Sequence, residues 1–356
     1  MPKIVYPAMD VGFPVQRGEL LRLAMLIRGQ GYLVDEKIAL TVEQFAAESV
    51  IVNALDCPPG PDIERLLLLF PGGIGDVLCM RSCLEHPELR EKYPALREIG
   101  FVSFIEDRYL IGGSINGIPL TIYDYPVAAE VYAAYDGCVS YSAVKRESIH
   151  KPLWASFSEG LALPMPIRAT ELVPDPNLRR AMAGFLKVGR RHIGIQMTSP
   201  SFYKSWHPPR AYELARELAD LRHSVYIIGG PGQRLDITQE DKRSQPHAGI
   251  YDVSGLLRNS GELIAFVSHM DGLVTIDSGV MHIAGCLEKP TVALFGLTDA
   301  ESRMGLYPSV TAIEGRADCS PCWNVSEVPT CGEPYCKAIA DIPAAEIIET
   351  LTTLIG

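Results

Sequence analysis

The sequence predicts an α/β protein with two parallel, doubly wound sheets, and three observations support this class. Apolar runs without alternation, such as L-L-L-L-F from Leu66, are typical of strands buried on both faces. Glycine-rich turns follow several of these runs, and segments with helical spacing separate them. Strands that alternate with helices in this way favour a parallel sheet with helices on both of its faces.

Length and charge limit the classes of function. The 356 residues exceed one ordinary core and predict two domains. Lys and Arg number 32 against 43 Asp and Glu, so the net charge is −11, which argues against stable nucleic-acid binding. Because neither a secretory signal nor an apolar stretch of about 18 residues occurs, we expect a cytoplasmic protein. A peripheral position at the inner membrane and a homo-oligomer both stay open.

Residues 1–62 are expected to form an N-terminal extension packed on the first domain. Two helices are predicted within it. The second follows a capping box made by Thr41 and Gln44 and covers 45–55. The stretch C-P-P-G-P at 57–61 ends the extension. The first helix is predicted from apolar residues at helical spacing: Leu20, Leu21, Ala24, Met25 and Ile27.

Residues 63–178 are predicted to form a Rossmann-like domain. Its strands are expected at 66–70, 100–105 and 119–123, and the turn P-G-G-I-G-D follows Phe70. Asn116-Gly117 indicates a hairpin turn. A linker-like P-D-P-N at 174–177 marks the junction with the next domain.

Residues 179–340 are predicted to form a second Rossmann-like domain, followed by a C-terminal helix within 341–356. Ligands of open parallel sheets lie beyond the carboxyl ends of the strands, so the turns after Phe70, Ile228 and Ile276 should face one cleft. The expected elements alternate: strand 192–196, helix 209–221, strand 225–228, helix 262–268, strand 273–276, helix 280–287, strand 291–296 and the final helix from Pro343 to Leu354.

The segment V-T-I-D-S-G-V-M-H-I-A-G at 274–285 predicts a phosphate site. An apolar strand runs directly into Asp277, Ser278 and Gly279, and a helix that carries His282 on its first turn follows. The first N–H groups of a helix have no partner within the helix, and the helix dipole favours an anion beside them. The segment is therefore suited to a phosphorylated ligand.

Four cysteines near the C-terminus indicate a structural metal site. Cys319, Cys322, Cys331 and Cys336 lie within the loop 316–340, and four soft thiolates can close a tetrahedral site for zinc or iron. Four reduced cysteines on a loop are the alternative. A reducing compartment argues against disulfides. The other five are expected to be small core residues: Cys57, Cys79, Cys83, Cys138 and Cys286.

Several ordered blocks resemble glycosyltransferase family 9, the heptosyltransferases that build bacterial lipopolysaccharide cores. They are L-L-L-L-F-P-G-G-I-G-D-V-L, K-S-W-H-P-P-R-A-Y-E-L-A, I-I-G-G-P-G-Q, D-S-G-V-M-H-I-A-G, K-P-T-V-A-L-F-G-L-T and C-S-P-C with two further cysteines. The resemblance covers about 66–352. It implies a GT-B fold, whose two Rossmann-like domains face an interdomain cleft, and an inverting transfer, commonly from ADP-heptose, without a catalytic divalent metal. Residues 1–60 loosely resemble the extra N-terminal element of autotransporter heptosyltransferases.

The resemblance implies that Asp76 is the base that takes the proton of the acceptor hydroxyl. Asp76 follows Gly72, Gly73 and Gly75, which let the turn approach a ligand closely. Asp76 at the start of a helix is also explained by the helix dipole alone. The turn lacks the third glycine of a dinucleotide-binding motif, so the first domain is expected to bind the acceptor.

The resemblance places the donor in the second domain. Lys204 is implied to contact the donor diphosphate, although a solvated surface lysine is the ordinary alternative. Asp277 is implied to contact sugar hydroxyls, and His282 either supports the turn or contacts the ligand. The sequence departs from the family at His207, which separates Trp206 from Pro208. The other expected donor contacts are Thr198, Ser199, Gly229, Gly230, Gln233, Ser278, Gly279 and Thr298.

Transfer of a sugar from a nucleotide-linked donor to a glycan or protein hydroxyl is the favoured function. A non-catalytic scaffold that binds nucleotide sugars is one alternative, and a nucleotide-sugar epimerase is another. Asp76, Lys204 and Asp277 together favour the enzyme, because a scaffold has no need of all three. The sequence leaves the acceptor open.

Overall fold

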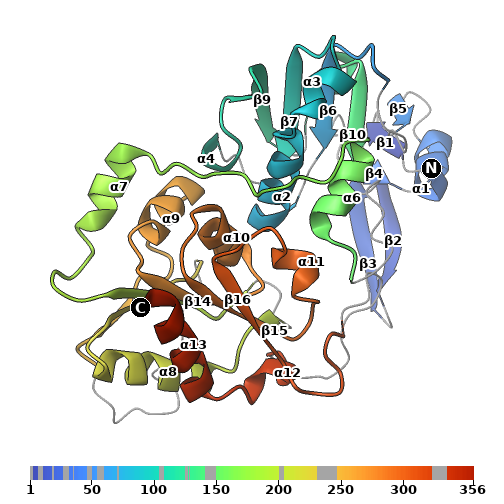
Figure 1. Ribbon diagram of the computed structural model, residues 1–356. Helices are drawn as coiled ribbons and strands as arrows, with labels where there is room; N and C mark the ends of the chain where they lie inside the picture. The colour runs from blue at the N-terminus through green and yellow to red at the C-terminus, as the bar shows by residue number, and fades with distance from the viewer. Residues whose placement is uncertain are drawn as a thin grey trace. The chain divides into compact units, whose positions relative to one another are not determined.

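The computed structural model divides the chain into two units, each described here by itself (Figure 1). Unit 1 contains 1–73, 83–145 and 154–166, and unit 2 contains 74–82, 146–153 and 167–356. Among the described residues, no helix has the length and apolar character to cross a bilayer. The structure describes residues 3–6, 11–17, 20–26, 32–34, 36–45, 50–53, 60–69, 72–103, 108–124, 127, 129–140, 150–199, 204–230, 247–322 and 335–356.

The N-terminal part of unit 1 is mainly β structure, and both helices predicted there are wrong. Residues 20–26 form strand β3 (Leu20–Leu26), which pairs antiparallel with β2 (Val11–Arg17). Arg17 is opposite Leu20 in this pair, and Gly18, which follows Arg17 in the sequence, is a residue that favours a hairpin. Helix α1 (Glu36–Phe45) ends where the second helix was predicted to begin. The sheet beside these elements has the order β4 (Tyr32–Val34), β1 (Lys3–Tyr6), β5 (Val50–Asn53).

The main sheet of unit 1 confirms the predicted strands in that region. Leu66 to Leu69 of strand β6 (Arg65–Leu69) are fully buried, as their unbroken apolar run predicts. Asn116 and Gly117 both have positive φ and join strand β8 (Ser114–Ile115) to strand β9 (Ile118–Asp124) with Ile115 opposite Ile118, which confirms the hairpin turn. The sheet order is β10 (Gly137–Ser140), β6 (Arg65–Leu69), β7 (Glu98–Ser103), β9 (Ile118–Asp124) and β8 (Ser114–Ile115), with only the last pair antiparallel.

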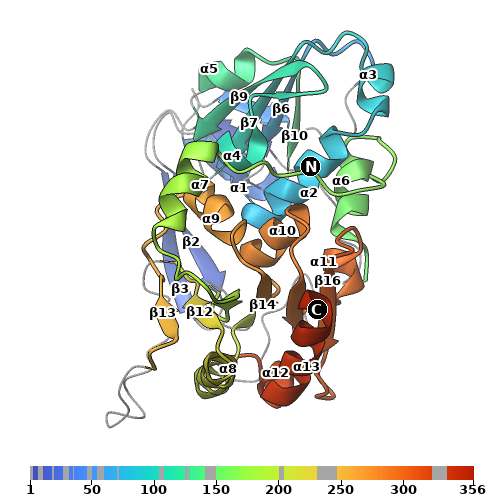
Figure 2. The ribbon, with the colours of Figure 1, turned by 60° about the vertical axis from the view of Figure 1, so that its left-hand side comes forward.

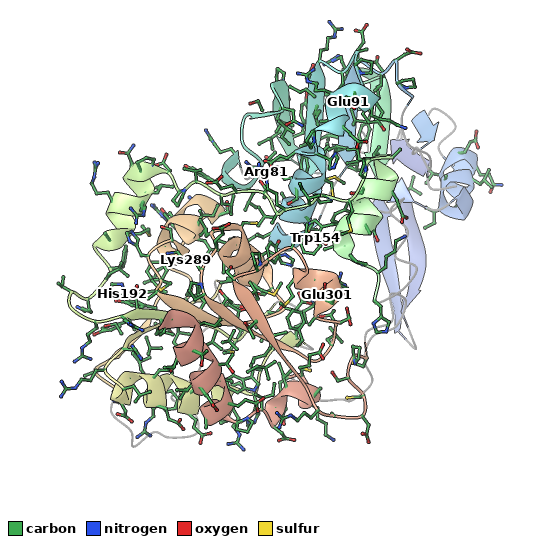
Figure 3. All side chains as sticks on the ribbon, viewed as in Figure 1. Arg81, Glu91, Trp154, His192, Lys289 and Glu301 are labelled. Carbon is green, nitrogen blue, oxygen red and sulfur yellow. The ribbon has the colours of Figure 1, made fainter. Side chains whose placement is uncertain are left out.

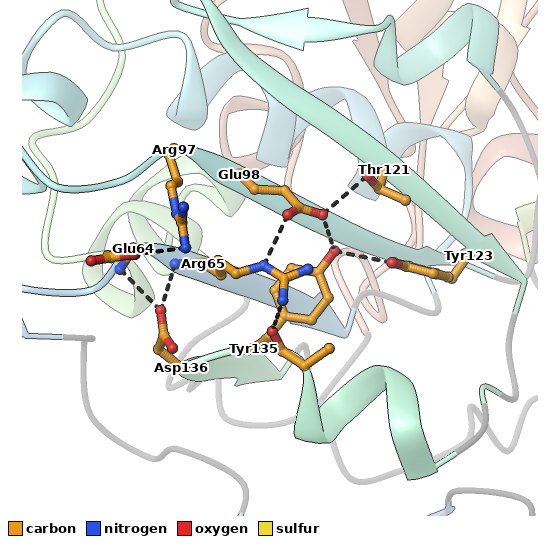
Figure 4. A network of polar contacts seen from close by, with 9 residues as sticks. Glu64, Arg65, Arg97, Glu98, Thr121, Tyr123, Tyr135 and Asp136 are labelled. Carbon is orange, nitrogen blue, oxygen red and sulfur yellow. Dashed lines mark hydrogen bonds and ion pairs between the residues drawn. The ribbon is translucent and has the colours of Figure 1, made fainter.

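A polar network joins the amino ends of neighbouring strands in this sheet (Figure 4). Arg65 Nε donates to Glu98 Oε2 at 2.9 Å, and the Tyr135 hydroxyl donates to Glu98 Oε1 at 2.9 Å. The hydrogen bond from Arg65 is the main cause that lowers the pKa of Glu98. The backbone N–H of Arg65 also donates to the Asp136 carboxylate at 2.8 Å. The network lies at the strand ends opposite to those that are expected to face a ligand.

The unit 2 sheet is parallel throughout its described strands. Its order places β11 and β14 at the centre, with Ile195 opposite Val274. The alternation predicted from residue 192 onward is confirmed, whereas the two edge strands were not predicted. The strands in order are β13 (Ile250–Asp252), β12 (Ser224–Ile227), β11 (His192–Gln196), β14 (Gly272–Ile276), β15 (Thr291–Phe295) and β16 (Val310–Glu314).

Helices cover the unit 2 sheet and supply its core (Figure 2). Helix α13 packs on β14, β15 and α8, and a Cβ on Gly272 would lie only 2.9 Å from Leu351 of α13. The described helices after residue 167 are α7 (Pro176–Ala183), α8 (Pro208–Asp220), α9 (Ser260–Val267), α10 (Gly279–Cys286), α11 (Glu301–Met304), α12 (Lys337–Ala340) and α13 (Ala344–Ile355), and the unit also includes residues 74–82 of α2.

The P-D-P-N segment begins a helix, so its interpretation as a linker is wrong. The Asp175 carboxylate accepts hydrogen bonds from the N–H groups of Asn177 and Leu178 at 2.9 and 3.0 Å. Pro176 occupies the first turn of α7, where a missing N–H costs nothing. The remaining helices are α2 (Ile74–Leu84), α3 (Glu88–Lys92), α4 (Arg108–Ile111), α5 (Ala129–Ala133) and α6 (Leu153–Gly160).

Candidate functional site

Asp277 is the centre of a buried polar cluster at the carboxyl end of β14. Its Oδ2 atom accepts a hydrogen bond from Lys204 Nζ at 2.7 Å and one from Thr298 Oγ1, also at 2.7 Å. The side chain of Asp277 is 7% exposed, while that of Lys204 is 24% exposed. The cluster thus brings together three predicted site residues from loops that follow β11, β14 and β15.

The electrostatic surroundings keep Asp277 ionised. Burial by itself would raise the pKa of the Asp277 carboxyl. The charges of Lys204 and Arg303 outweigh burial and hold this pKa well below its usual range. Arg303 is buried on α11, the short helix that also carries Glu301 (Figure 3). Sequence reasoning missed Arg303, because no local pattern distinguishes it from a surface arginine.

The first turn of α10 begins directly after Asp277. Ser278 stands at the N-cap position, but its side chain does not cap the helix. Its hydroxyl donates instead to Gln196 Oε1 at 2.7 Å, which ties the turn to β11. The first backbone N–H groups of α10 have no acceptor within the helix, so this turn has the character of an anion site beside Lys204.

Two glycines allow the first turns of α2 and α10 to touch. A Cβ on Gly279 would lie 2.8 Å from Ile74 Cβ. A Cβ on Gly75 would lie 2.3 Å from His282 Cδ2 and 2.6 Å from His282 Nε2. Asp76 follows Gly75 on the first turn of α2 and is half-buried. Close packing thus explains Gly75 of the glycine-rich turn, and it brings Asp76 near His282.

His282 is a buried, neutral histidine. Burial lowers its pKa to about 4, although the charges of Asp277 and Asp76 act in the opposite direction. Its Nδ1 atom lies 2.9 Å from the Tyr307 hydroxyl. The Tyr307 contact was not predicted, since 25 residues of sequence separate the two side chains.

The segment that follows Lys204 is fixed by its contacts with the core. Trp206 is fully buried, and its Nε1 donates to the carbonyl of Ile339 at 2.7 Å, so Trp206 is a packing residue of the core. His207 is the N-cap residue of α8, and Pro208 begins the helix. His207 has an extended backbone, which is the conformation that a residue directly before a proline prefers.

Several other predicted donor contacts lie in loops at the carboxyl ends of strands. Thr198 and Ser199 follow β11, and the Ser199 N–H donates to Ser205 Oγ at 3.0 Å. Gly229 and Gly230 follow β12, where the Gly229 carbonyl accepts from the N–H of Gly255 at 2.9 Å. Gly73 is exposed just before α2. Gln233 lies outside the described residues.

The four C-terminal cysteines are only partly described. Cys319 is exposed, Cys322 is half-buried and Cys336 is buried, while Cys331 lies outside the described residues. Ser320 Oγ donates to the Gly296 carbonyl at 3.0 Å, and a Cβ on Gly296 would lie 2.6 Å from Cys336 Sγ. Within the part of the chain that the structure describes, no three His, Cys, Asp or Glu side chains form a group that could hold a metal.

The scattered cysteines mostly behave as core residues. Cys79, Cys83 and Cys286 are buried, and Cys138 is half-buried. Burial raises the pKa of Cys83 to about 12, which makes this thiol unreactive. Cys57 lies outside the described residues.

Comparison with solved structures finds the same fold in three bacterial proteins. E. coli ADP-heptose lipopolysaccharide heptosyltransferase II is 17% identical with a TM-score of 0.61, and the match covers 82% of this chain and 98% of that one. A family 9 glycosyltransferase from Veillonella parvula is 16% identical with a TM-score of 0.59, covering 85% and 99%. The iron-containing dodecameric glycosyltransferase TibC from enterotoxigenic E. coli is 13% identical with a TM-score of 0.56, covering 99% and 90%.

Sequence comparison identifies the family directly. No curated protein matches the chain at a significant level. The family described as glycosyltransferase family 9 (heptosyltransferase) matches residues 144–330, which include Lys204, Asp277, His282 and Thr298. This range is more than half of the chain, and the α/β fold agrees with the GT-B heptosyltransferase structures. The chain therefore belongs to glycosyltransferase family 9, the heptosyltransferase family.

Proposed function

We propose that this glycosyltransferase moves a heptose from ADP-heptose to an acceptor hydroxyl with inversion at the anomeric carbon. The single observation that carries the proposal is the contact between the first turns of α2 and α10. One turn bears Asp76, and the other follows the ionised Asp277 and its partner Lys204. ADP-heptose is proposed as the donor because heptosyltransferase II of E. coli, which shares the fold, uses ADP-heptose.

The proposed reaction is a single displacement. The acceptor oxygen attacks the anomeric carbon while Asp76 takes its proton, and the bond from that carbon to the diphosphate oxygen breaks. The electron pair leaves with ADP. Positive groups lower the energy of this departure, and the first N–H groups of α10 with the Lys204 ammonium are suited to that task. Because the reaction is a single displacement with one base and no covalent intermediate, the configuration at the anomeric carbon is inverted.

Asp277 has two tasks in this proposal. It holds Lys204 by the 2.7 Å hydrogen bond, and it faces the sugar hydroxyls as an ionised acceptor. An ammonium carries three donors, so Lys204 can bond a phosphate oxygen while it remains bonded to Asp277. Thr298 fixes the same carboxylate oxygen from the other side. Gly229, Gly230 and Gln233 are proposed to border the nucleoside.

Donor binding is the direct test. ADP-heptose at about 100 times its Kd should raise the apparent free energy of unfolding by about 2.7 kcal/mol, because it binds only the folded chain. The shift should disappear in Lys204→Met and persist in the control Lys187→Met, which removes an exposed ammonium. Thermal unfolding measures both. If ADP-heptose stabilises wild type and Lys204→Met equally, the assignment of Lys204 is wrong.

Transfer is tested with separate acceptors. Three assays use lipopolysaccharide core, another glycan or a protein as the acceptor. In each assay, mass spectrometry detects an added heptose together with released ADP. We propose a glycan or protein hydroxyl as the acceptor. Rearranged donor in the absence of acceptor would support an epimerase instead. Binding without any product in all three assays would support the scaffold.

We also propose a structural zinc or iron on Cys319, Cys322, Cys331 and Cys336. The thiolate set suits either metal, and Gly296 lies next to Cys336 and accepts a hydrogen bond from Ser320, which stands between Cys319 and Cys322 in the sequence. TibC, which shares the fold, is an iron-containing dodecamer, and this supports both a metal and an oligomer for the present chain. Such a metal would hold the loop after β16 without entering the reaction.

Elemental analysis of protein purified without added metal tests this site. We expect about one zinc or iron per chain, because four thiolates satisfy the metal completely. Cys319→Ser should lose most of it, whereas the control Cys138→Ser should keep it. A metal content near zero in the wild-type protein would end the proposal.

A further inference from the structure

The ring of His282 has a different environment at each nitrogen. Nδ1 lies 2.9 Å from the Tyr307 hydroxyl and 3.9 Å from Cys79 Sγ. The Nε2 edge faces the first turn of α2, since a Cβ on Gly75 would lie 2.6 Å from that nitrogen. One side of the ring therefore contacts the interior, and the other faces the proposed reaction site.

Tyr307 is held firmly beside this ring. It is buried, and a Cβ on Gly285 would lie 2.3 Å from Tyr307 Cγ, so the phenol packs flat on α10. The two rings meet edge to face, with centroids 5.5 Å apart and an angle of 79° between their planes. Gly285 thus makes room for the side chain that contacts His282.

The direction of the hydrogen bond follows from the surroundings of the phenol. Burial and the neighbouring thiols raise the pKa of Tyr307 well above its usual value, so the hydroxyl keeps its proton. Cys286 Sγ lies 3.9 Å from this hydroxyl as a weak donor. Nδ1 of the neutral His282 is the strong acceptor within reach, because thiol sulfur accepts only weakly. With the Cys286 thiol as a donor to the phenol oxygen, the hydroxyl is best assigned as the donor to Nδ1, because the reverse direction would leave the phenol proton only weakly accepting sulfur.

This donation fixes the tautomer of the imidazole. A neutral imidazole carries one proton, so an acceptor Nδ1 places that proton on Nε2. The Cys79 thiol, if it donates to Nδ1, favours the same tautomer. His282 then presents an N–H at the junction of the two first turns, beside the turn that bears Asp76.

We propose that Tyr307 is a positioning residue that fixes His282 as the Nε2–H tautomer and thereby supplies a neutral N–H donor for the leaving diphosphate. The inference rests on the proposed function for the identity of the anion. A neutral donor suits a leaving group, because it stabilises the developing charge without having to be protonated at neutral pH. Tyr307 acts only through His282 and does not touch the ligand.

Nitrogen NMR of the free protein, labelled with ¹⁵N at its eight histidines, tests the tautomer without any substrate. The His282 signal is assigned by its loss in His282→Gln. We expect the Nε2–H form in the wild type and a mixture of tautomers in Tyr307→Phe, which keeps the ring on Gly285 but removes the donor. The kcat/KM for ADP-heptose should fall about tenfold in Tyr307→Phe, the scale of one lost hydrogen bond.

A matched control separates this role from a structural one. Tyr93 is also a buried phenol, and its hydroxyl donates to the Leu161 carbonyl at 2.5 Å. Tyr93→Phe should leave both the tautomer and kcat/KM unchanged. An Nδ1–H form in the wild type overturns the proposal even if Tyr307→Phe does not fold, and so does an unchanged tautomer in Tyr307→Phe. If NMR shows the expected tautomers but the protein transfers no sugar, only the proposed function is refuted.

Discussion

Replacing Asp76 with asparagine is expected to lower turnover by about 10²–10⁴-fold, because the variant cannot take the proton of the acceptor hydroxyl. Asparagine has nearly the same shape, so the contacts of Gly75 with His282 should persist. The affinity for ADP-heptose should therefore stay within a few-fold of wild type. ADP release with the accepted substrate measures turnover, and thermal unfolding with donor measures binding.

A helix-terminus role for Asp76 predicts a different outcome. An acidic side chain in a first turn contributes only about 0.3–1 kcal/mol to stability through the helix dipole. Glu130→Gln removes an exposed charge from the first turn of another helix, α5, and serves as the control. If Asp76→Asn behaves like Glu130→Gln, with turnover intact and a small loss of stability, Asp76 is not the base.

Asp277→Asn is expected to be the most destabilising single change in the described site. The carboxylate is buried, and Lys204 pairs with it while the charge of Arg303 also stabilises it, so its loss leaves the Lys204 ammonium without this acceptor. Breaking a buried ion pair from one side costs about 3–5 kcal/mol. Urea unfolding should show this loss, and donor binding should weaken as well because Lys204 loses its anchor.

Two comparisons make this prediction specific. Glu213→Gln removes an acid from the exposed pair with Arg210, where both side chains are 48% exposed, and should cost at most about 1 kcal/mol. The double variant Lys204→Met with Asp277→Asn should lose less stability than the sum of its single variants. Equal losses in Asp277→Asn and Glu213→Gln would mean that the cluster does not depend on the carboxylate.

The sequence predicts unit 2 well because its strands are buried on both faces. Val274 and Ile276 of β14 are fully buried, and the unbroken apolar run shows this without ambiguity. The turn at 277–279 is predictable for a related reason. A buried parallel strand ends in a polar loop at the carboxyl edge of the sheet, where ligands bind. The clustering of Asp277, Lys204 and Thr298 follows from this shared edge.

The N-terminal part was mispredicted because short apolar runs do not distinguish helix from strand. Residues 20–26 are apolar at six of seven positions, so they satisfy a helical pattern and a strand equally. Gly18 was the signal that could have decided for a hairpin. Arg303 and Tyr307 could not be predicted, since the charge effect of Arg303 on Asp277 and the contact of Tyr307 with His282 arise from the tertiary structure, which no local spacing reveals.

The close fit of Gly75 against the imidazole of position 282 has a consequence for related chains. A methyl group at position 75 would overlap the ring, so a chain with alanine there can keep the two helices in contact only with a smaller residue at position 282. The two positions should therefore covary among family members, although about 200 residues separate them. A natural chain that combines alanine with histidine must hold its helices further apart.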